Sequence, residues 1–248
     1  RDGGWVRDSA RFGDSAAILL GDLLLGYSDD LLGEGVTALE HRDRAAAVRA
    51  EFSRMRAEVT LGQYLDSLEE HAWIAFPDAE AKQRAHRVIV YKSAKYSVEA
   101  PLAIGAIAAG VDATRLEALR EFGVPLGVAF QLRDDLLGVY GDPEVTGKPA
   151  GDDLREGKRT VLVALARESL PGAGRSLVDE LLGDADLSDE QIGMLRRAFV
   201  DCGAVDQVER AIAFNVERAL QALDRADLAP AATRELRALA EAVATRTS

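Results

Sequence analysis

The sequence predicts an all-α protein. The alternation of Val, Ile and Tyr that is typical of strands is scarce, and no Asn-Gly pair indicates a hairpin turn. Long segments rich in Ala, Leu, Glu and Arg instead repeat apolar residues at intervals of three and four, which is the spacing of one helix face. These observations predict helices joined by short loops.

The expected helices cover most of the chain. In order, they span about 14–31, 35–69, 79–92, 95–109, 112–140, 153–168, 174–183, 188–201, 203–225 and 230–246. The first contains the stretch from Ala16 to Leu25, which is apolar on almost every side, so this helix is expected to be central in the fold. The second is unusually long, and a break is expected within it.

Several helix starts have a recognisable capping sequence. Asp112 is the expected N-cap of the helix at 112–140, and Ser188 or Asp189 is the expected N-cap of the one at 188–201. The sequences FPDAE and LAPAATRE occupy similar positions before the third and the last expected helices. Side-chain oxygens at these positions accept hydrogen bonds from the free N–H groups of the first helical turn.

Composition limits the domain organisation and the compartment. With 248 residues, 48% hydrophobic and 29% charged, and without a linker-like segment, the chain is expected to form a single domain over 1–248. The one cysteine, Cys202, excludes an intramolecular disulfide and a cysteine-based zinc cluster, and this favours the cytoplasm. No apolar run of about 18 residues is present, so stable membrane insertion is not expected, although a membrane-derived substrate remains compatible.

Charge argues against one class of partner. The formal charge of −12 disfavours nucleic acid, which is bound through clustered Lys and Arg. It does not disfavour a small anion, because salt screens charges that lie beyond roughly 8–10 Å, and local groups dominate binding.

The segment FQLRDDLLG places adjacent aspartates in an apolar helical run. Gln131, Asp134, Asp135 and Gly138 follow one another at spacings that put an amide, a carboxylate and a gap on one helix face. A carboxylate among apolar residues must be solvated, paired or bound to a cation, and Mg²⁺ is bound by carboxylates together with water. The alternative is that Asp134 forms an ion pair with Arg133 or with a lysine elsewhere.

Two glycine-containing segments follow this helix. Lys148 lies in VTGKPAG and Lys158 in REGKRT, where the backbone can fold close to a bound group and an ammonium can donate to phosphate oxygens. Together they suggest one wall of a diphosphate site. Either segment alone would be interpreted as an ordinary surface loop.

Two further segments carry polar residues in apolar surroundings. In VYKSAKYSVEAP, Lys92 and Tyr96 share a helix face, and a helix that breaks near Ser93 could present lysine, hydroxyl and phenol to one anion. In LGQYLD, Gln63 and Asp66 form either a buried hydrogen-bonded pair or part of the site wall. The sequence leaves these alternatives open.

The order of GQYLD, YKSAKY and FQLRDDLLGVYGDPEVTGKPAGDDLREGKRT resembles the trans-isoprenyl diphosphate synthases, or polyprenyl synthetases. A looser similarity extends over nearly the whole chain and includes FGDSAAILLGDLLL. The resemblance implies an isoprenoid synthase-type helical bundle around a deep central cavity, usually homodimeric. It also implies elongation of an allylic diphosphate with isopentenyl diphosphate to a short-chain product, with geranylgeranyl favoured over farnesyl diphosphate.

The resemblance further implies roles for individual residues. Mg²⁺ would be bound at Asp134, with Asp135 beside it. The three lysines would hold the allylic diphosphate, and Phe130 would face the growing chain. The full set of expected substrate-binding residues is Lys92, Ser93, Tyr96, Phe130, Gln131, Lys148 and Lys158.

The sequence departs from the family pattern in two places. Gly138 stands where the second aspartate-rich motif often has a third aspartate, and Asp142 is one possible substitute. The first aspartate-rich motif is absent, and the chain begins with a segment that resembles the region just after it. We therefore expect a C-terminal portion of a longer chain. A non-catalytic partner subunit is the main alternative, whereas a terpene cyclase is disfavoured because its downstream metal motif is not found.

Overall fold

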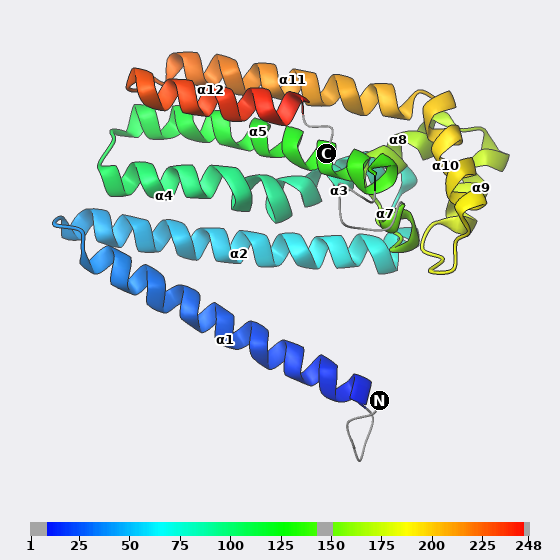
Figure 1. Ribbon diagram of the computed structural model, residues 1–248, viewed down its shortest axis with the longest axis horizontal. Helices are drawn as coiled ribbons and strands as arrows, with labels where there is room; N and C mark the ends of the chain where they lie inside the picture. Colours follow the sequence, from blue (N-terminus) through cyan, green and yellow to red (C-terminus); the bar gives the residue numbers. More distant parts are fainter. Residues whose placement is uncertain (1–8, 143–150, 246–248) are drawn as a thin grey trace. The chain divides into compact units, whose positions relative to one another are not determined.

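The computed structural model describes residues 9–142 and 151–245, and these form helices connected by short loops (Figure 1). No strand occurs within these two ranges, so the all-α prediction is confirmed. The chain divides into two compact units, residues 1–50 and residues 51–248, which are described separately.

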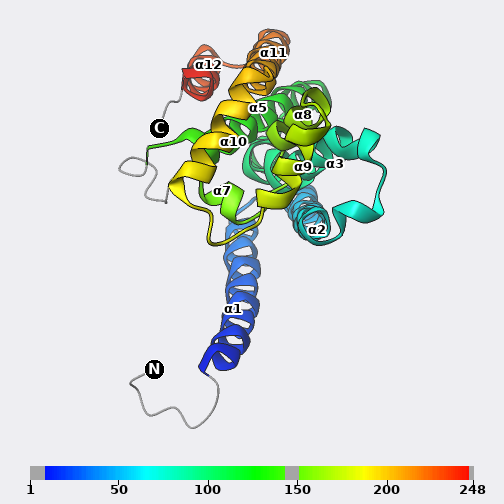
Figure 2. The same cartoon turned by 90° about the vertical axis from the view of Figure 1, so that its right-hand side faces the viewer.

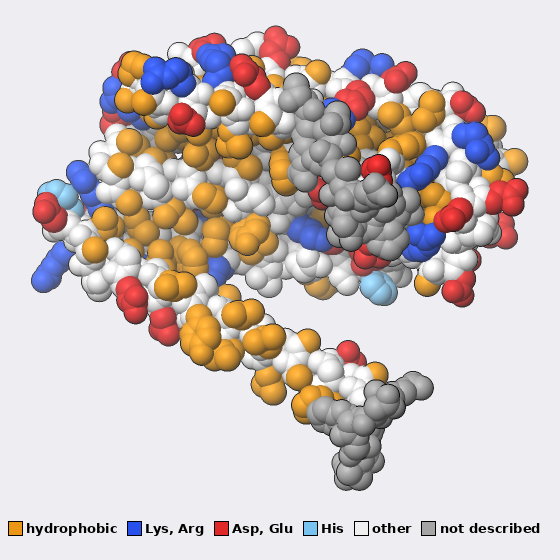
Figure 3. Space-filling view, in the orientation of Figure 1, with side chains coloured by type: hydrophobic (Ala, Val, Ile, Leu, Met, Phe, Trp, Pro, Cys, Tyr) orange, Lys and Arg blue, Asp and Glu red, His pale blue; other side chains and the backbone are white. Residues whose placement is uncertain are grey.

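The first unit contains α1 (Ser9–Thr37) and the start of α2 (Arg42–Ala72). The boundary expected at residues 32–34 is wrong, because α1 continues to Thr37. It falls at residues 38–41 instead, and α2 has no break between Arg42 and Ala72. Hydrophobic side chains gather along α1 (Figure 3). Those that are exposed are Phe12, Ile18, Leu19, Leu20, Leu23, Leu24, Leu25, Tyr27 and Leu31. Within the first unit these side chains are not covered, because the start of α2 offers too little surface for a helix that is apolar on several sides. The expectation that this helix is central in the fold stays a prediction.

The second unit contains the remainder of α2 and all later elements. These are η1 (Trp73–Ala75), η2 (Asp78–Glu80), α3 (Ala81–Val88), η3 (Ile89–Glu99), α4 (Ala100–Ala109), α5 (Ala113–Tyr140), α7 (Asp152–Arg155), α8 (Val161–Ser169), α9 (Gly172–Leu181), α10 (Asp189–Asp201), α11 (Ala204–Arg225) and α12 (Pro230–Thr245). In Figure 1, α4, α5 and α11 lie in parallel rows, and α8, α9 and α10 gather at the right-hand end. Figure 2 views the same helices from that end.

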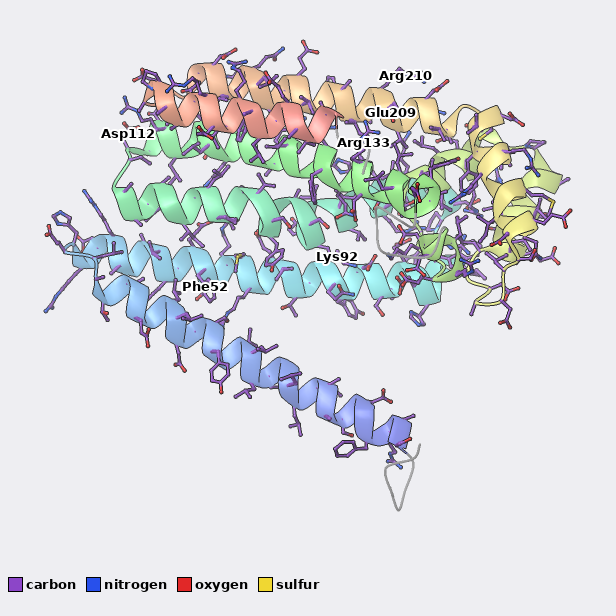
Figure 4. All side chains as sticks on the ribbon, viewed as in Figure 1. Phe52, Lys92, Asp112, Arg133, Glu209 and Arg210 are labelled. Carbon is purple, nitrogen blue, oxygen red and sulfur yellow. The ribbon has the colours of Figure 1, made fainter. Side chains whose placement is uncertain are left out.

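Helix α5 is the centre of the second unit. It packs against η3 and α4 on one side and against α11 and α12 on the other. Phe122, Leu126 and Ala129 are fully buried along it. On the α11 side, Arg133 donates two hydrogen bonds to Glu209, at 2.6 and 2.7 Å (Figure 4). This central position fixes the direction in which the polar residues near the end of α5 can point.

The helices expected at 79–92 and 95–109 are one continuous helical stretch. Residues Ile89–Glu99 form a π-helix between α3 and α4, so the break expected near Ser93 does not occur. The π-helical turns are wider than α-helical turns and are frequent at functional sites. Two glycines of α5 let this stretch approach closely, since a β-carbon on Gly127 would lie 2.5 Å from the α-carbon of Ala94.

The prediction of one continuous helix at 153–168 is also wrong, because α7 ends at Arg155 and α8 begins only at Val161. Gly157 adopts a positive φ of 77°, which ends the short helix at little steric cost. Thr160 then caps α8 by accepting a hydrogen bond from the backbone N–H of Val163. Lys158 consequently lies in a loop between two helices.

Two of the predicted caps are confirmed, whereas the one expected at FPDAE is wrong, because neither Pro77 before η2 nor Glu80 before α3 makes a side-chain capping hydrogen bond. The Asp112 side chain accepts a hydrogen bond from the backbone N–H of Arg115 at the start of α5. Ser188 and Gln191 form a reciprocal capping box at the start of α10. Each cap satisfies backbone donors that would otherwise lack a partner.

Candidate functional site

Four segments of the second unit enclose a cavity of about 190 Å³. They are α2, the stretch from α3 into η3, the end of α5, and the segment from α7 to the start of α8. The lining residues are Asp66, Ala85, Val88, Ile89, Lys92, Ser93, Gln131, Asp134, Asp135, Asp153, Lys158, Arg159 and Thr160. Six of the residues predicted for one site are therefore brought to one place, although they are far apart in the sequence: Lys92, Ser93, Gln131, Asp134, Asp135 and Lys158.

Lys92 enters this cavity from η3 beside α2 (Figure 4). Its ammonium donates to the carboxylate of Asp66. The two backbones meet because Gly62 lies one turn before Asp66, and a β-carbon there would overlap the backbone of Lys92. Asp66 is thus part of the site wall, whereas Gln63 is exposed, which decides between the two alternatives for LGQYLD.

Lys158 enters the cavity from the loop between α7 and α8. It donates to Asp153 at 2.5 Å and to Glu156 at 2.9 Å. Burial opposes the charge on Lys158, but the hydrogen bonds to these two carboxylates outweigh it and raise the pKa of Lys158 above its ordinary value. Lys158 is therefore a fixed cation at neutral pH.

The adjacent aspartates of α5 have different environments. Asp134 is exposed on the cavity wall, whereas Asp135 is 5% exposed and accepts a hydrogen bond of 2.8 Å from Gln131. Burial raises the pKa of Asp135 to about 7. Arg133 pairs with Glu209, so the alternative in which Arg133 neutralises Asp134 is wrong. Asp134 is the carboxylate of this pair that an incoming cation can reach.

The gap at Gly138 is filled from another helix. A β-carbon on Gly138 would overlap the carboxylate of Asp153 in α7. Asp153 is 7% exposed, and burial raises its pKa despite the hydrogen bond from Lys158. A carboxylate therefore lies where the sequence suggested that one was missing. It belongs to Asp153 rather than to Asp142, which does not line the cavity.

The donor set is compatible with Mg²⁺. Within the described ranges, no group of three or more His, Cys, Asp or Glu side chains forms a ready-made metal site. Mg²⁺ does not require one, because it is usually bound through one or two carboxylates, several waters and substrate phosphates. Asp134, with Asp153 nearby, supplies oxygen ligands of the required type at a wall shared with two lysines.

A model of the polyprenyl synthetase family matches residues 5–198. The chain belongs to this family. Because polyprenyl synthetases share the all-α isoprenoid synthase fold, the fold and the family predicted from the sequence are both confirmed.

Named relatives of this polyprenyl synthetase chain include synthases of several product lengths. It is 36% identical over 228 residues to a geranylfarnesyl diphosphate synthase of Aeropyrum pernix, covering 91% of this chain and 68% of the relative. It is 30% identical to a geranylgeranyl diphosphate synthase of Sulfolobus acidocaldarius, covering 73% of this chain and 53% of the relative. The chain thus spans about half to two thirds of the length of these curated relatives.

A solved structure gives a close spatial match to this polyprenyl synthetase. It is the geranylgeranyl pyrophosphate synthase of Corynebacterium glutamicum, in complex with isoprenyl diphosphate and magnesium. The TM-score is 0.89 at 39% identity, and the match covers 98% of this chain and 66% of that one.

Two of the described residues that were predicted for the site, Tyr96 and Phe130, do not line the 190 Å³ cavity. Tyr96 is 48% exposed one turn beyond Lys92, and Phe130 is partly buried against the core. Lys148 lies outside the described residues. Their roles remain predictions. The structure adds Asp153 and Arg159, which were missed because the sequence placed the first at a helix start and gave the second no distinguishing spacing.

A larger hollow of about 650 Å³ lies elsewhere, along α5 and α11. It is lined by charged side chains that neutralise one another, as in the pair of Arg120 with Glu99 and the pair of Arg225 with Glu121. None of the described residues that were predicted for the site lines this hollow, whereas six of them line the smaller cavity. The smaller cavity is therefore the candidate site of this polyprenyl synthetase.

Proposed function

We propose that this protein is a Mg²⁺-dependent trans-prenyltransferase that condenses isopentenyl diphosphate with an allylic diphosphate. The observation that carries the proposal is the meeting of Lys92, Asp134 and Lys158 at one cavity, where two cations and an accessible carboxylate face the same space. Family membership and the names of the relatives support it.

The residues of the cavity fit the first step of this reaction. When the allylic carbon–oxygen bond breaks, the electron pair leaves with the diphosphate, and negative charge develops on its oxygens. Lys92 and Lys158 are placed to donate to those oxygens in a partly buried site, where such interactions are strong. Mg²⁺ bound through Asp134 would supply further positive charge to the same oxygens.

The second step requires no protein nucleophile. The double bond of isopentenyl diphosphate attacks the allylic cation and forms the new carbon–carbon bond, and loss of a proton then restores an alkene. The departing diphosphate, held by the lysines, is positioned to accept that proton. The contribution of the protein is to hold the leaving group and to keep water away from the cation.

We propose a short-chain product, with geranylgeranyl diphosphate ahead of farnesyl diphosphate. The support is the set of relatives, which includes geranylgeranyl and geranylfarnesyl synthases, and the Corynebacterium structure. No observation favours a non-catalytic partner subunit, since the named relatives are synthases and the space at Gly138 holds the Asp153 carboxylate.

We also propose that the protein is a homodimer and cytoplasmic. The exposed apolar residues of α1 support the first part, because such a surface is typical of protein interfaces. The free thiol of Cys202 is compatible with a reducing compartment. Among the described residues, no helix has the length and apolar character that would be needed to cross a bilayer.

The test is a product assay. The purified protein is incubated with Mg²⁺, isopentenyl diphosphate and, in separate reactions, dimethylallyl, geranyl and farnesyl diphosphate, and products are identified by chromatography and mass spectrometry. We expect chain elongation that stops at geranylgeranyl diphosphate and that EDTA abolishes. Absence of any elongated product from folded protein with every primer would contradict the proposal.

A further inference from the structure

A cluster of charged and aromatic side chains lies just outside the cavity, around Trp73. Trp73 follows the last residue of α2 and begins η1. The guanidinium carbon of Arg159 lies 3.8 Å from the centroid of its indole ring, and that of Arg167 lies 4.7 Å from the centroid. Both distances are within the range of cation–π interaction, for which Trp is the most favourable partner.

The two arginines are fixed by shared carboxylates. Asp179 accepts from Arg159 at 3.1 Å and from Arg167 at 2.7 Å, and Asp78 accepts from Arg167 at 2.5 Å. The side chains of Arg159 and Arg167 are only 10% and 8% exposed. Two cations this close would repel each other without these partners. Their geometry is therefore determined by Asp179, Asp78 and the indole together.

Arg159 connects this cluster to the candidate site. It lines the 190 Å³ cavity and directly follows Lys158 in the chain. On the other side of Lys158, Gly157 packs against Gly183, where a β-carbon would lie 2.9 Å from the Gly183 α-carbon. Thr160 is the N-cap of α8. Both chain neighbours of Lys158 are therefore fixed by packing: Gly157 contacts Gly183, and Arg159 contacts Trp73.

Trp73 lies close in sequence to Asp66, the α2 residue that is the partner of Lys92. It stands seven residues after Asp66, which pairs with Lys92, in the 3-10 turn that directly follows α2. The contact between Trp73 and Arg159 therefore links the helix that orients Lys92 with the loop that carries Lys158. Among the described residues of the cavity, no carboxylate or amide side chain forms a hydrogen bond between α2 and the Lys158 loop.

We propose that Arg159, stacked on Trp73, is a positioning residue that holds the Lys158 loop in the geometry required for binding diphosphate. The inference rests on the proposed function and assigns the two residues a task in it. Arg159 acts through Lys158, without touching the substrate. A lysine on a flexible stem binds more tightly when its backbone is already fixed, because less conformational freedom is lost on binding.

The test removes either half of the stack. Arg159→Met removes the guanidinium but keeps an apolar stem, and Asp179 still has Arg167 as its partner, so no buried carboxylate is left unpaired. Trp73→Leu removes the ring and leaves the Arg159 charge in place. Arg218→Met is the matched control, since Arg218 lies 5.8 Å from the Phe214 ring on α11, away from the cavity.

Two measurements are made on each folded variant. Calorimetric titration with inorganic diphosphate in the presence of Mg²⁺ is expected to show about tenfold weaker binding for both variants, which corresponds to about 1.4 kcal/mol, and unchanged binding for the control. Hydrogen exchange is expected to be about tenfold faster at the amide of Lys158, which donates to the Asp153 carbonyl at 3.1 Å. Trp73→Phe and Arg159→Lys, which retain a ring or a charge, should recover part of both effects and provide folded samples if the larger changes unfold the chain.

The outcomes separate the two claims. If Trp73→Leu binds diphosphate like the wild type while Arg159→Met does not, Arg159 contacts the ligand itself and the positioning role is wrong. If exchange at Lys158 is the same in the wild type and both variants, the inference is also wrong. Failure of the wild type to bind diphosphate would instead contradict the proposed function, and the exchange result would still decide whether Trp73 and Arg159 fix the loop.

Discussion

The carboxylate of Asp153 occupies the space that a side chain at position 138 would need, because a β-carbon on Gly138 would overlap it. Asp153 is buried and holds Lys158 through a hydrogen bond of 2.5 Å. A glycine in α5 therefore allows an acidic side chain from α7 to reach the cavity. The absence of a third aspartate in FQLRDDLLG is coupled to the position of a carboxylate 15 residues later.

The first prediction concerns this contact. Gly138→Ala should lower the free energy of unfolding by about 1–3 kcal/mol, because the added methyl group displaces a buried side chain. Gly105→Ala in α4 is the matched control, since nothing lies within 4 Å of its added β-carbon, and it should stabilise by about 0.5–1 kcal/mol through helix propensity. Urea unfolding measures both. Equal effects of the two substitutions would show that Asp153 does not fill the space at Gly138.

The second prediction follows from the burial of Asp135. Its pKa is raised to about 7 from 3.8, so the folded state holds this proton to higher pH than the unfolded state does. Stability attributable to Asp135 therefore falls as the pH rises from about 4 to 7. Asp135→Asn removes this loss, and the variant should gain about 2–3 kcal/mol relative to the wild type between pH 5 and pH 8.

This pH effect is measured as the difference in unfolding free energy between variant and wild type at the two pH values, without metal. Asp134→Asn is the control, because it makes the same chemical change at the exposed neighbour. If the unfolding free energies of the two variants change equally between pH 5 and pH 8, Asp135 is not a buried, protonated carboxyl.

The third prediction concerns two side-chain ion pairs that lie outside the candidate site. Arg120 pairs with Glu51 and Glu99, which are 6% and 3% exposed. Arg120→Leu leaves these carboxylates with less compensation and should cost about 3–5 kcal/mol. Arg225→Leu, at an exposed pair with Glu121 of 2.7 Å, should cost less than about 1 kcal/mol. Thermal unfolding measures the stability that each variant loses. A larger loss for Arg225→Leu than for Arg120→Leu would contradict the prediction.

The fourth prediction concerns turnover. Asp134→Ala should lose most Mg²⁺-dependent product formation, by about a hundredfold or more, with helical content by circular dichroism unchanged because Asp134 is exposed. Asp206→Ala, an exposed aspartate in the first turn of α11, is the control and should turn over normally. Normal turnover of Asp134→Ala would remove Asp134 from the metal site.

The sequence predicted the helices well where periodicity and caps agreed. The range 112–140 with Asp112 as its cap differs by one residue from α5, since both signals are local. The helix expected at 153–168 was wrong because its apolar spacing continues through Gly157, whose positive φ ends α7. The π-helix at Ile89–Glu99 was not predicted; it lies close to α5 at Gly127, a contact between segments that are far apart in the sequence.

The candidate site was predictable in part for a similar reason. Lys92, Asp134 and Lys158 were recognisable because each lies in an unusual local sequence and because their order resembles the family. Asp153 and Arg159 contact residues that are distant in the sequence, Gly138 in one case and Trp73 in the other, and neither contact leaves a pattern in the sequence. Contacts of this kind require the fold.

The most direct test of the central claim is the binding of diphosphate by the residues that meet in the cavity. Inorganic diphosphate is titrated calorimetrically into the wild type and Lys158→Ala, each with Mg²⁺ and with EDTA. The account predicts Mg²⁺-dependent binding to the wild type and binding at least about tenfold weaker to Lys158→Ala, equivalent to 1.4 kcal/mol or more. Equal binding by the two proteins, or binding that does not depend on Mg²⁺, would contradict it.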